Sequence, residues 1–231
     1  MVSLLLVATV SQACATLTLN ASRAFFSRTH PADQACWRKY ERGKLDSCDQ
    51  SHDWVIKTSS AVKKLQAETE DAATVCTGAD SDALQSVNFC ATGYELTDPS
   101  ELDHCIANRV LFDSYDLLNI EFAGVNFEPE YRLYIPCADA VARSADGFMS
   151  RCLAGGACDP ADPIENSKAT HSILRACKLD TVVDVVREEG FQGPPPFPCA
   201  NADTAAKMAA CELSEHAKVA KRLLLLQGRS N

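Results

Sequence analysis

Motifs that commit a chain to a known chemistry are missing from these 231 residues. There is no G-x-S-x-G turn to present a nucleophilic serine, and no G-x-G-x-x-G or Walker loop to cradle phosphates. No H-E-x-x-H pair places two imidazoles on one helical face, and the five histidines lie far apart in the sequence. We therefore expect no cofactor, no metal site and no catalytic residues, although an enzyme stays open as an alternative.

Positive charge and long apolar runs are also scarce. Lys and Arg total 22 against 31 Asp and Glu, so the net charge is -9, and the basic residues are scattered. A phosphate backbone would be repelled, which argues against nucleic acid as a partner. Beyond the N-terminus no run of about 18 apolar residues exists, so we expect no transmembrane segment.

Closely spaced cysteine pairs are absent, yet the chain has 12 cysteines. The two closest, Cys152 and Cys158, are separated by five residues, whereas zinc ribbons and small redox rings need thiolates about two to four residues apart. Dispersed spacing favours disulfide bonds over metal binding. The predicted disulfide cysteines are Cys36, Cys48, Cys76, Cys90, Cys105, Cys137, Cys152, Cys158, Cys177, Cys199 and Cys211.

The N-terminus predicts a signal peptide over residues 1–15. Met1 to Val10 is a short apolar run followed by small residues, although its start carries no Lys or Arg, and a core strand is the alternative. Cleavage after Ala15 would discard Cys14 and leave an odd number of cysteines, so one thiol would be free or intermolecular. Cleavage after Ala13 would keep all twelve.

A secretory route gives meaning to the sequon Asn20-Ala21-Ser22. Asn20 is the predicted glycosylation site. Together with the disulfides, it predicts a secreted, extracellular glycoprotein.

Apolar residues recur at intervals of three and four, which predicts an all-α fold. We expect a disulfide-stapled bundle of about six to eight helices, over residues 54–76, 83–90, 102–117, 137–152, around 173–177, and 203–223. Ser81 or Asp82 is expected to cap the second of these, and Asp203 the last. A Val-rich helix at 182–186 is also expected, although its β-branched residues favour strands. Because several cysteines lie on the inward faces, the disulfides should join helix to helix.

The stretch 122–129 interrupts the helical pattern. It divides the chain into an N-terminal cysteine-rich helical half, residues 16–122, and a C-terminal one, residues 130–231. These halves are one domain or two helical subdomains. The Pro-rich run 194–198 is expected to be an extended connector, and the leucines at 223–226 are expected to cover a core.

Two further patterns have weak functional interpretations. His52-Asp53 beside Cys48 is similar to the His-Asp pair of secreted phospholipases, but the calcium-loop glycines are absent. Asp159, Asp162 and Glu165 offer oxygens to calcium but lack the turn glycine of an EF-hand, so an ordinary polar turn is favoured.

The second half resembles the 27 kDa haemolymph glycoprotein family of insects. The residues concerned are Cys137 to Cys152 with Phe148 and Leu153, then Cys177, the segment Arg187 to Gly190, Cys199 and Cys211. The resemblance spans roughly Cys137 to Glu212 and implies an extracellular helical protein of invertebrate body fluid. It supplies no catalytic residues.

Three functional hypotheses remain from the sequence. The first is a secreted non-catalytic carrier or binding protein, whose partner is a small apolar ligand or a protein. The second is a secreted hydrolase whose histidine and carboxylate meet only in the fold. The third is a host-interaction protein that acts through an exposed apolar surface.

Overall fold

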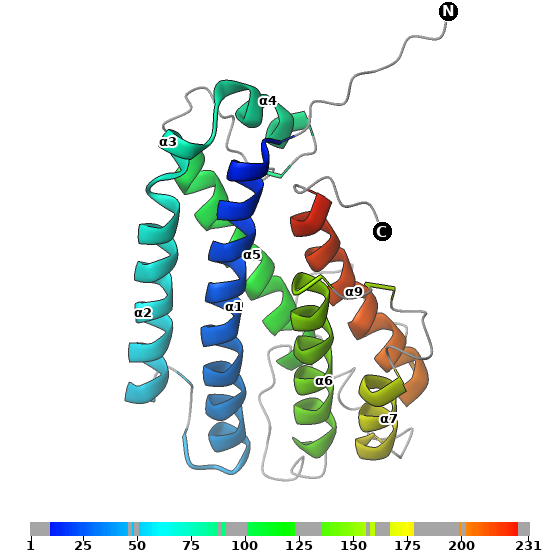
Figure 1. The fold of residues 1–231 in the computed structure, drawn as a ribbon. Coiled ribbons are helices and arrows are strands. Elements are labelled where there is room, and N and C mark those ends of the chain that lie inside the picture. The colour runs from blue at the N-terminus through cyan, green and yellow to red at the C-terminus, as the bar shows by residue number, and fades with distance from the viewer. Residues whose placement is uncertain are drawn as a thin grey trace, which may run out of the picture.

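The structure is a computed structural model. It describes residues 10–45, 48, 51–86, 89–90, 101–122, 135–155, 158–159, 167–177, 199 and 202–225. Helices make up the regular structure of these ranges and no strand occurs in them, so the predicted all-α, disulfide-stapled fold is confirmed (Figure 1). The expected break at 123–129, Val-rich helix, Pro-rich connector, Asp162 and Glu165 lie outside the described residues.

The helices pack as neighbouring rods around α1. Their bounds are α1 Gln12–Glu41, α2 His52–Thr69, α3 Ala72–Val75, α4 Gly78–Ser86, α5 Leu102–Phe122, α6 Ile135–Leu153, α7 Ser167–Ala176 and α9 Ala205–Leu225. Helix α1 lies between α2 and α6, and α9 packs against the other side of α6 with α7 (Figure 1). Helix α1 therefore contacts elements of both halves of the chain.

Helix α1 is the largest departure from the sequence-based prediction. Residues 12–15, assigned to the signal peptide, form its first turn, and Cys14 and Ala15 are fully buried. Pro31 lies inside the helix and removes the N–H that would bond to the Ser27 carbonyl, which is a strong helix-breaking signal. The buried face nevertheless forms, because tertiary packing outweighs the local preference.

The expected helix 54–76 is two helices. Helix α2 begins at His52, where the Ser51 hydroxyl accepts from the Trp54 amide, and ends at Thr69. The short α3 follows, and the backbone then becomes extended at Cys76. This turn brings Cys76 to Cys14, where the two form a disulfide. The apolar pattern alone predicted one continuous helix through this point.

The cap of α4 lies earlier than expected. Thr77, rather than Ser81 or Asp82, precedes the helix, and its amide donates to Asp80 Oδ2 at 2.7 Å. The Asp80 amide in turn faces Thr77 Oγ1 at 3.4 Å, which makes a reciprocal capping box. Ser11 also donates from its hydroxyl to Asp80 at 3.0 Å, so the same carboxylate anchors the start of α1.

Helix α9 begins one residue later than expected. The Thr204 hydroxyl accepts from the Lys207 amide at 3.2 Å and is the N-cap, in place of Asp203. At the other end Leu223 and Leu224 are buried, which confirms that these leucines cover the core.

Ten cysteines form five disulfides, and all twelve are among the described residues. The bonds are Cys14–Cys76, Cys36–Cys48, Cys90–Cys105, Cys137–Cys177 and Cys199–Cys211. Each of the five joins a cysteine within a helix to one outside the helices, so the expected helix-to-helix pattern is wrong in detail. Cys14, which the predicted set omits, is bonded to Cys76, and Cys152 lies in contact with Cys158.

The main hydrophobic core combines residues from both halves, including Phe25 on α1, Ile106 on α5, Phe148 on α6 and Leu223 on α9. A smaller core joins α6, α7 and the first turns of α9. The two predicted halves thus share one interior. In the described part of the chain, no helix has the length and apolarity that crossing a bilayer requires.

Candidate functional site

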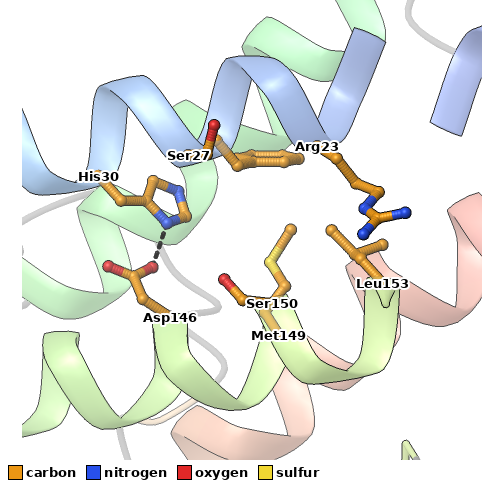
Figure 2. Close-up of a pocket in the computed structure, with 8 residues that line it drawn as sticks. Arg23, Ser27, His30, Asp146, Met149, Ser150 and Leu153 are labelled. Atoms are coloured by element: carbon orange, nitrogen blue, oxygen red, sulfur yellow. Dashed lines mark ion pairs between the residues drawn. The ribbon is translucent and has the colours of Figure 1, made fainter. Parts of the chain in front are cut away.

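A buried cluster of ionisable side chains lies where α1, α6 and α9 meet. Asp146 of α6 is 8% exposed and forms an ion pair with His30 Nδ1 of α1 (Figure 2). On its other side, His216 Nε2 of α9 lies 3.9 Å from the same carboxylate oxygen, and His216 is 0% exposed. Asp146 therefore balances two imidazoles in the interior, where an uncompensated charge would be costly.

The α1 side of this cluster follows from helical spacing. His30, Asp33 and Gln34 are three and four residues apart, so they share one face. Gln34 donates to Asp146 Oδ2 at 2.6 Å, while Asp33 Oδ1 accepts from the Trp54 indole of α2 at 2.6 Å. Gln34 thus connects α1 to α6, and its neighbour Asp33 connects α1 to α2.

The pKa values of the two buried carboxylates, Asp146 and Asp33, are shifted in opposite directions. Burial alone would raise the pKa of Asp146, but the imidazole of His30, with smaller contributions from His216 and Gln34, holds it below its ordinary value. Burial raises the pKa of Asp33 to about 6, against the opposing effects of the Trp54 hydrogen bond and the His30 charge. Asp146 is therefore the permanent anion, whereas Asp33 gains or loses a proton near pH 6.

A pocket opens beside the cluster between α1 and α6. Its volume is about 170 Å³, and Arg23, Phe26, Ser27 and His30 of α1 face Asp146, Met149, Ser150 and Leu153 of α6. Phe26, Met149 and Leu153 are buried and form an apolar floor, whereas Arg23, Ser27 and Ser150 are exposed and form the rim. Figure 2 shows Met149 and Leu153 rising from α6 toward α1.

The pocket is electrically uneven along its length. Arg23 lies at one end and the His30–Asp146 pair at the other (Figure 2). No acidic side chain in the described part of the chain pairs with Arg23, whereas Asp146 is already matched by His30 and Gln34. An incoming anion therefore meets an uncompensated guanidinium at the Arg23 end.

A second buried carboxylate, Asp113 of α5, has a structural environment. It pairs with Arg109 one turn earlier on α5 and with Arg222 Nη1 of α9 at 2.5 Å. Burial raises the pKa of Asp113 to about 6, although Arg109 opposes this. These contacts join α5 to α9.

The other candidates from the sequence are dispersed over the surface. His52, His104 and His171 are exposed, and Asp53 pairs with Lys57, so no phospholipase-like dyad forms at the start of α2. Asn20 is exposed on α1 while Ser22 of its sequon is buried and bonds to the Thr18 carbonyl. Within the described residues, no group of three or more His, Cys, Asp or Glu side chains could hold a metal ion.

Exposed apolar side chains are Val55 and Ile56 on α2, Phe112 on α5 and Leu174 on α7. Scattered apolar residues of this kind are ordinary on a protein surface.

Sequence reasoning missed both members of the His30–Asp146 pair. The helix that carries His30 was not predicted, so the spacing of His30, Asp33 and Gln34 had no structural meaning. Asp146 lies within the clean apolar stripe of α6, where a carboxylate next to core positions is unusual. The position of Asp146 beside core residues was the one signal in the sequence that pointed to this site.

Comparison with known proteins identifies no relative: no family model, curated protein or solved structure matches the chain.

Proposed function

We propose that this protein is a secreted, non-catalytic binding protein whose pocket between α1 and α6 takes a small ligand with an apolar body and an anionic end. The observation that carries this is the pocket itself, with its buried apolar floor and an unpaired arginine on the rim. A scaffold with five disulfides supports it, because a pre-formed rigid pocket loses little entropy when it binds.

The size of the pocket restricts the ligand. A volume of about 170 Å³ is close to the roughly 150 Å³ of an engineered cavity that admits benzene. It is well below the 300 Å³ or more of pockets for drug-sized molecules. We therefore infer a ligand of one ring or a short chain, and this pocket does not suit a long-chain lipid.

Charge selects among small ligands. A carboxylate placed against Arg23 forms a charge-assisted hydrogen bond, and its apolar body then lies on Met149, Leu153 and Phe26. Ser27 and Ser150 offer hydroxyls at the rim. The ligand class is a small amphipathic monoanion such as an aromatic or short aliphatic carboxylate.

An extracellular setting is part of the proposal. Disulfides form and persist in oxidising compartments, and the chain has five. The apolar N-terminus, the Asn20 sequon and the resemblance of residues 137–212 to the haemolymph glycoprotein family point the same way. Signal-peptide cleavage, glycosylation at Asn20 and a place in a body fluid belong to this proposal.

Saturation-transfer NMR with two probes tests the pocket. Benzoate supplies a ring and a carboxylate, and benzyl alcohol supplies a similar ring without charge. Ser150→Trp places an indole over the rim from an exposed position, and we expect it to abolish binding of both probes. Ser60→Trp, on the exposed face of α2, is the matched control and should leave both signals unchanged.

The charge is tested separately with Arg23→Gln. We expect benzoate to bind about 10- to 100-fold more weakly and benzyl alcohol to bind unchanged, since a charge-assisted hydrogen bond contributes roughly 1.5–3 kcal/mol. Equal loss of both probes would contradict the anionic ligand class. Benzoate binding that survives Ser150→Trp would contradict the pocket.

A second candidate, a hydrolase, is favoured by the way His30 pairs with Asp146. Pairing through Nδ1 is the arrangement in which a carboxylate orients an imidazole so that Nε2 acts as a general base. Two serines line the same pocket. If this candidate holds, the protein releases p-nitrophenol from p-nitrophenyl acetate, and His30→Asn removes that activity. Release no faster than by free imidazole at the same concentration would dismiss it.

A further inference from the structure

Cys152 and Cys158 come together at the C-terminal end of α6. Cys152 is fully buried on the helix and Cys158 is 2% exposed, and both belong to the main core. The two side chains are hydrogen-bonded to each other. Two buried thiols in contact, in a chain whose other ten cysteines are all paired, are the geometric precondition for one more bond.

The local backbone explains how the two meet. Helix α6 ends at Leu153, where Gly155 adopts a positive φ of 94°, a conformation that favours glycine. The Gly155 amide bonds to the Cys152 carbonyl at 2.9 Å and closes the last turn. The last turn of α6 therefore closes at Gly155, three residues before Cys158, whose side chain contacts Cys152.

We propose that Cys152 and Cys158 are a modification site, which a disulfide-bearing oxidant converts into a sixth disulfide during secretion. One thiol, as thiolate, attacks the oxidant disulfide and forms a mixed disulfide. The other thiolate then attacks that bond, joins the two cysteine sulfurs and releases the oxidant as a dithiol. The cysteine pair loses two protons and two electrons, and the oxidant takes both electrons. The five other disulfides require the same class of oxidant.

The timing of this step follows from burial. Desolvation raises the pKa of the Cys152 thiol, and the adjacent Cys158 raises it further, so little thiolate exists once the core has closed. Oxidation therefore takes place during folding, before α6 packs against α9. Once formed, the bond is equally shielded from reductants, since neither sulfur faces solvent.

The bond would fix one wall of the pocket. Met149 and Ser150 line the pocket one turn before Cys152, and Leu153 follows it directly. The bond joins the last turn of α6 to the returning chain, so it holds these residues in register with α1. This inference does not depend on the ligand proposed above.

The test is the oxidation state of the wild-type protein secreted from eukaryotic cells. Denatured without reductant and treated with iodoacetamide, it should show no alkylated cysteine, and its mass should be twelve hydrogens below that of the reduced chain. Non-reducing peptide mapping should recover a Cys152–Cys158 crosslink. Alkylation of both residues, or recovery of either in a bond with another cysteine, would overturn the inference.

Two paired variants supply the control. Cys152→Ser together with Cys158→Ser should lower the melting temperature, and the mass should then lie ten hydrogens below the reduced form. Cys36→Ser with Cys48→Ser removes an established bond and should change the hydrogen count by the same amount. An unchanged hydrogen deficit in the first variant would show that no sixth bond existed.

Discussion

Gln34 of α1 donates a hydrogen bond of 2.6 Å to Asp146 of α6, and this contact joins residues 112 positions apart. Together with His30, it surrounds a carboxylate that would otherwise be a buried charge without compensation. These contacts to Asp146 fix how α1 lies against α6. The packing of the two helices in turn sets the width of the pocket between them.

Removal of this carboxylate should be strongly destabilising. Asp146→Ala removes the carboxylate that pairs with His30 and accepts from Gln34, and a broken buried pair typically costs about 3–5 kcal/mol. Urea unfolding followed by circular dichroism at pH 7 measures the free energy of unfolding. Asp53→Ala removes an exposed carboxylate paired with Lys57 and should have little effect. Equal losses in the two variants would mean that the cluster does not hold α1 to α6.

Asp33 should make the protein less stable as the pH rises through 6. The folded-state pKa is about 6 and the ordinary value is 3.8, so the folded protein binds this proton more tightly than the unfolded chain. The resulting stability is fully present below pH 3.8 and is lost as the pH rises through about 6.

Asp33→Asn removes that dependence and keeps an oxygen for the Trp54 indole. We expect the variant to gain stability relative to wild type between pH 4 and pH 7, by about 1–3 kcal/mol. Urea midpoints at half-unit pH intervals measure the difference, in which the similar contribution of Asp113 cancels. If the free energies of unfolding of wild type and Asp33→Asn changed with pH in the same way, the raised pKa of Asp33 would be contradicted.

The fold class was predictable because it depends on repeated apolar spacing, which survives errors at individual residues. Helices α6 and α9 show this, since their cysteines, alanines and leucines mark one face even though buried polar residues such as Asp146 and His216 share it. Helix α1 was hidden by two misleading local signals, the apolar N-terminus and Pro31. The site was hidden with it, because Asp146 acquires a partner only when α1 packs on α6. Such pairings depend on tertiary contacts that a helical period does not contain.

If the N-terminus is cleaved on secretion, as proposed above, the Cys14–Cys76 bond limits where the mature chain begins. Cleavage after Ala15 would delete Cys14 and leave Cys76 without its partner, whereas cleavage at or before Ala13 keeps the bond. We expect N-terminal sequencing of the secreted protein to show a first residue no later than Cys14. A mature chain that starts at Thr16 would contradict this bond.

The same bond should be the most stabilising of the five, because its sequence separation of 62 is the largest. Its removal in Cys14→Ser with Cys76→Ser should cost about 4 kcal/mol on the loop-entropy model. Cys199→Ser with Cys211→Ser opens a separation of 12 and should cost about 3 kcal/mol. Guanidinium unfolding compares the two, and the reverse order would contradict the loop-entropy account.

Pro31 should cost α1 stability while it shapes the pocket. It is exposed, so Pro31→Ala creates no cavity, and the new amide can donate to the Ser27 carbonyl. A proline inside a helix costs up to about 3 kcal/mol, and the greater freedom of the unfolded alanine chain offsets part of that gain. We expect the free energy of unfolding to rise by about 1–2 kcal/mol, whereas Gln66→Ala on the exposed face of α2 should change it by under about 0.5 kcal/mol.

Although Pro31→Ala should stabilise the fold, we expect it to weaken ligand binding. Ser27 and His30 both line the pocket, and both lie within one turn before Pro31. A restored helical hydrogen bond at Ser27 draws these residues toward ideal helix geometry and away from the positions that fit the ligand. We therefore expect weaker benzoate binding in a more stable protein, because functional sites often keep a local violation at the expense of stability. Unchanged benzoate affinity in the stabilised variant would show that Pro31 is tolerated by the fold and has no part in the pocket.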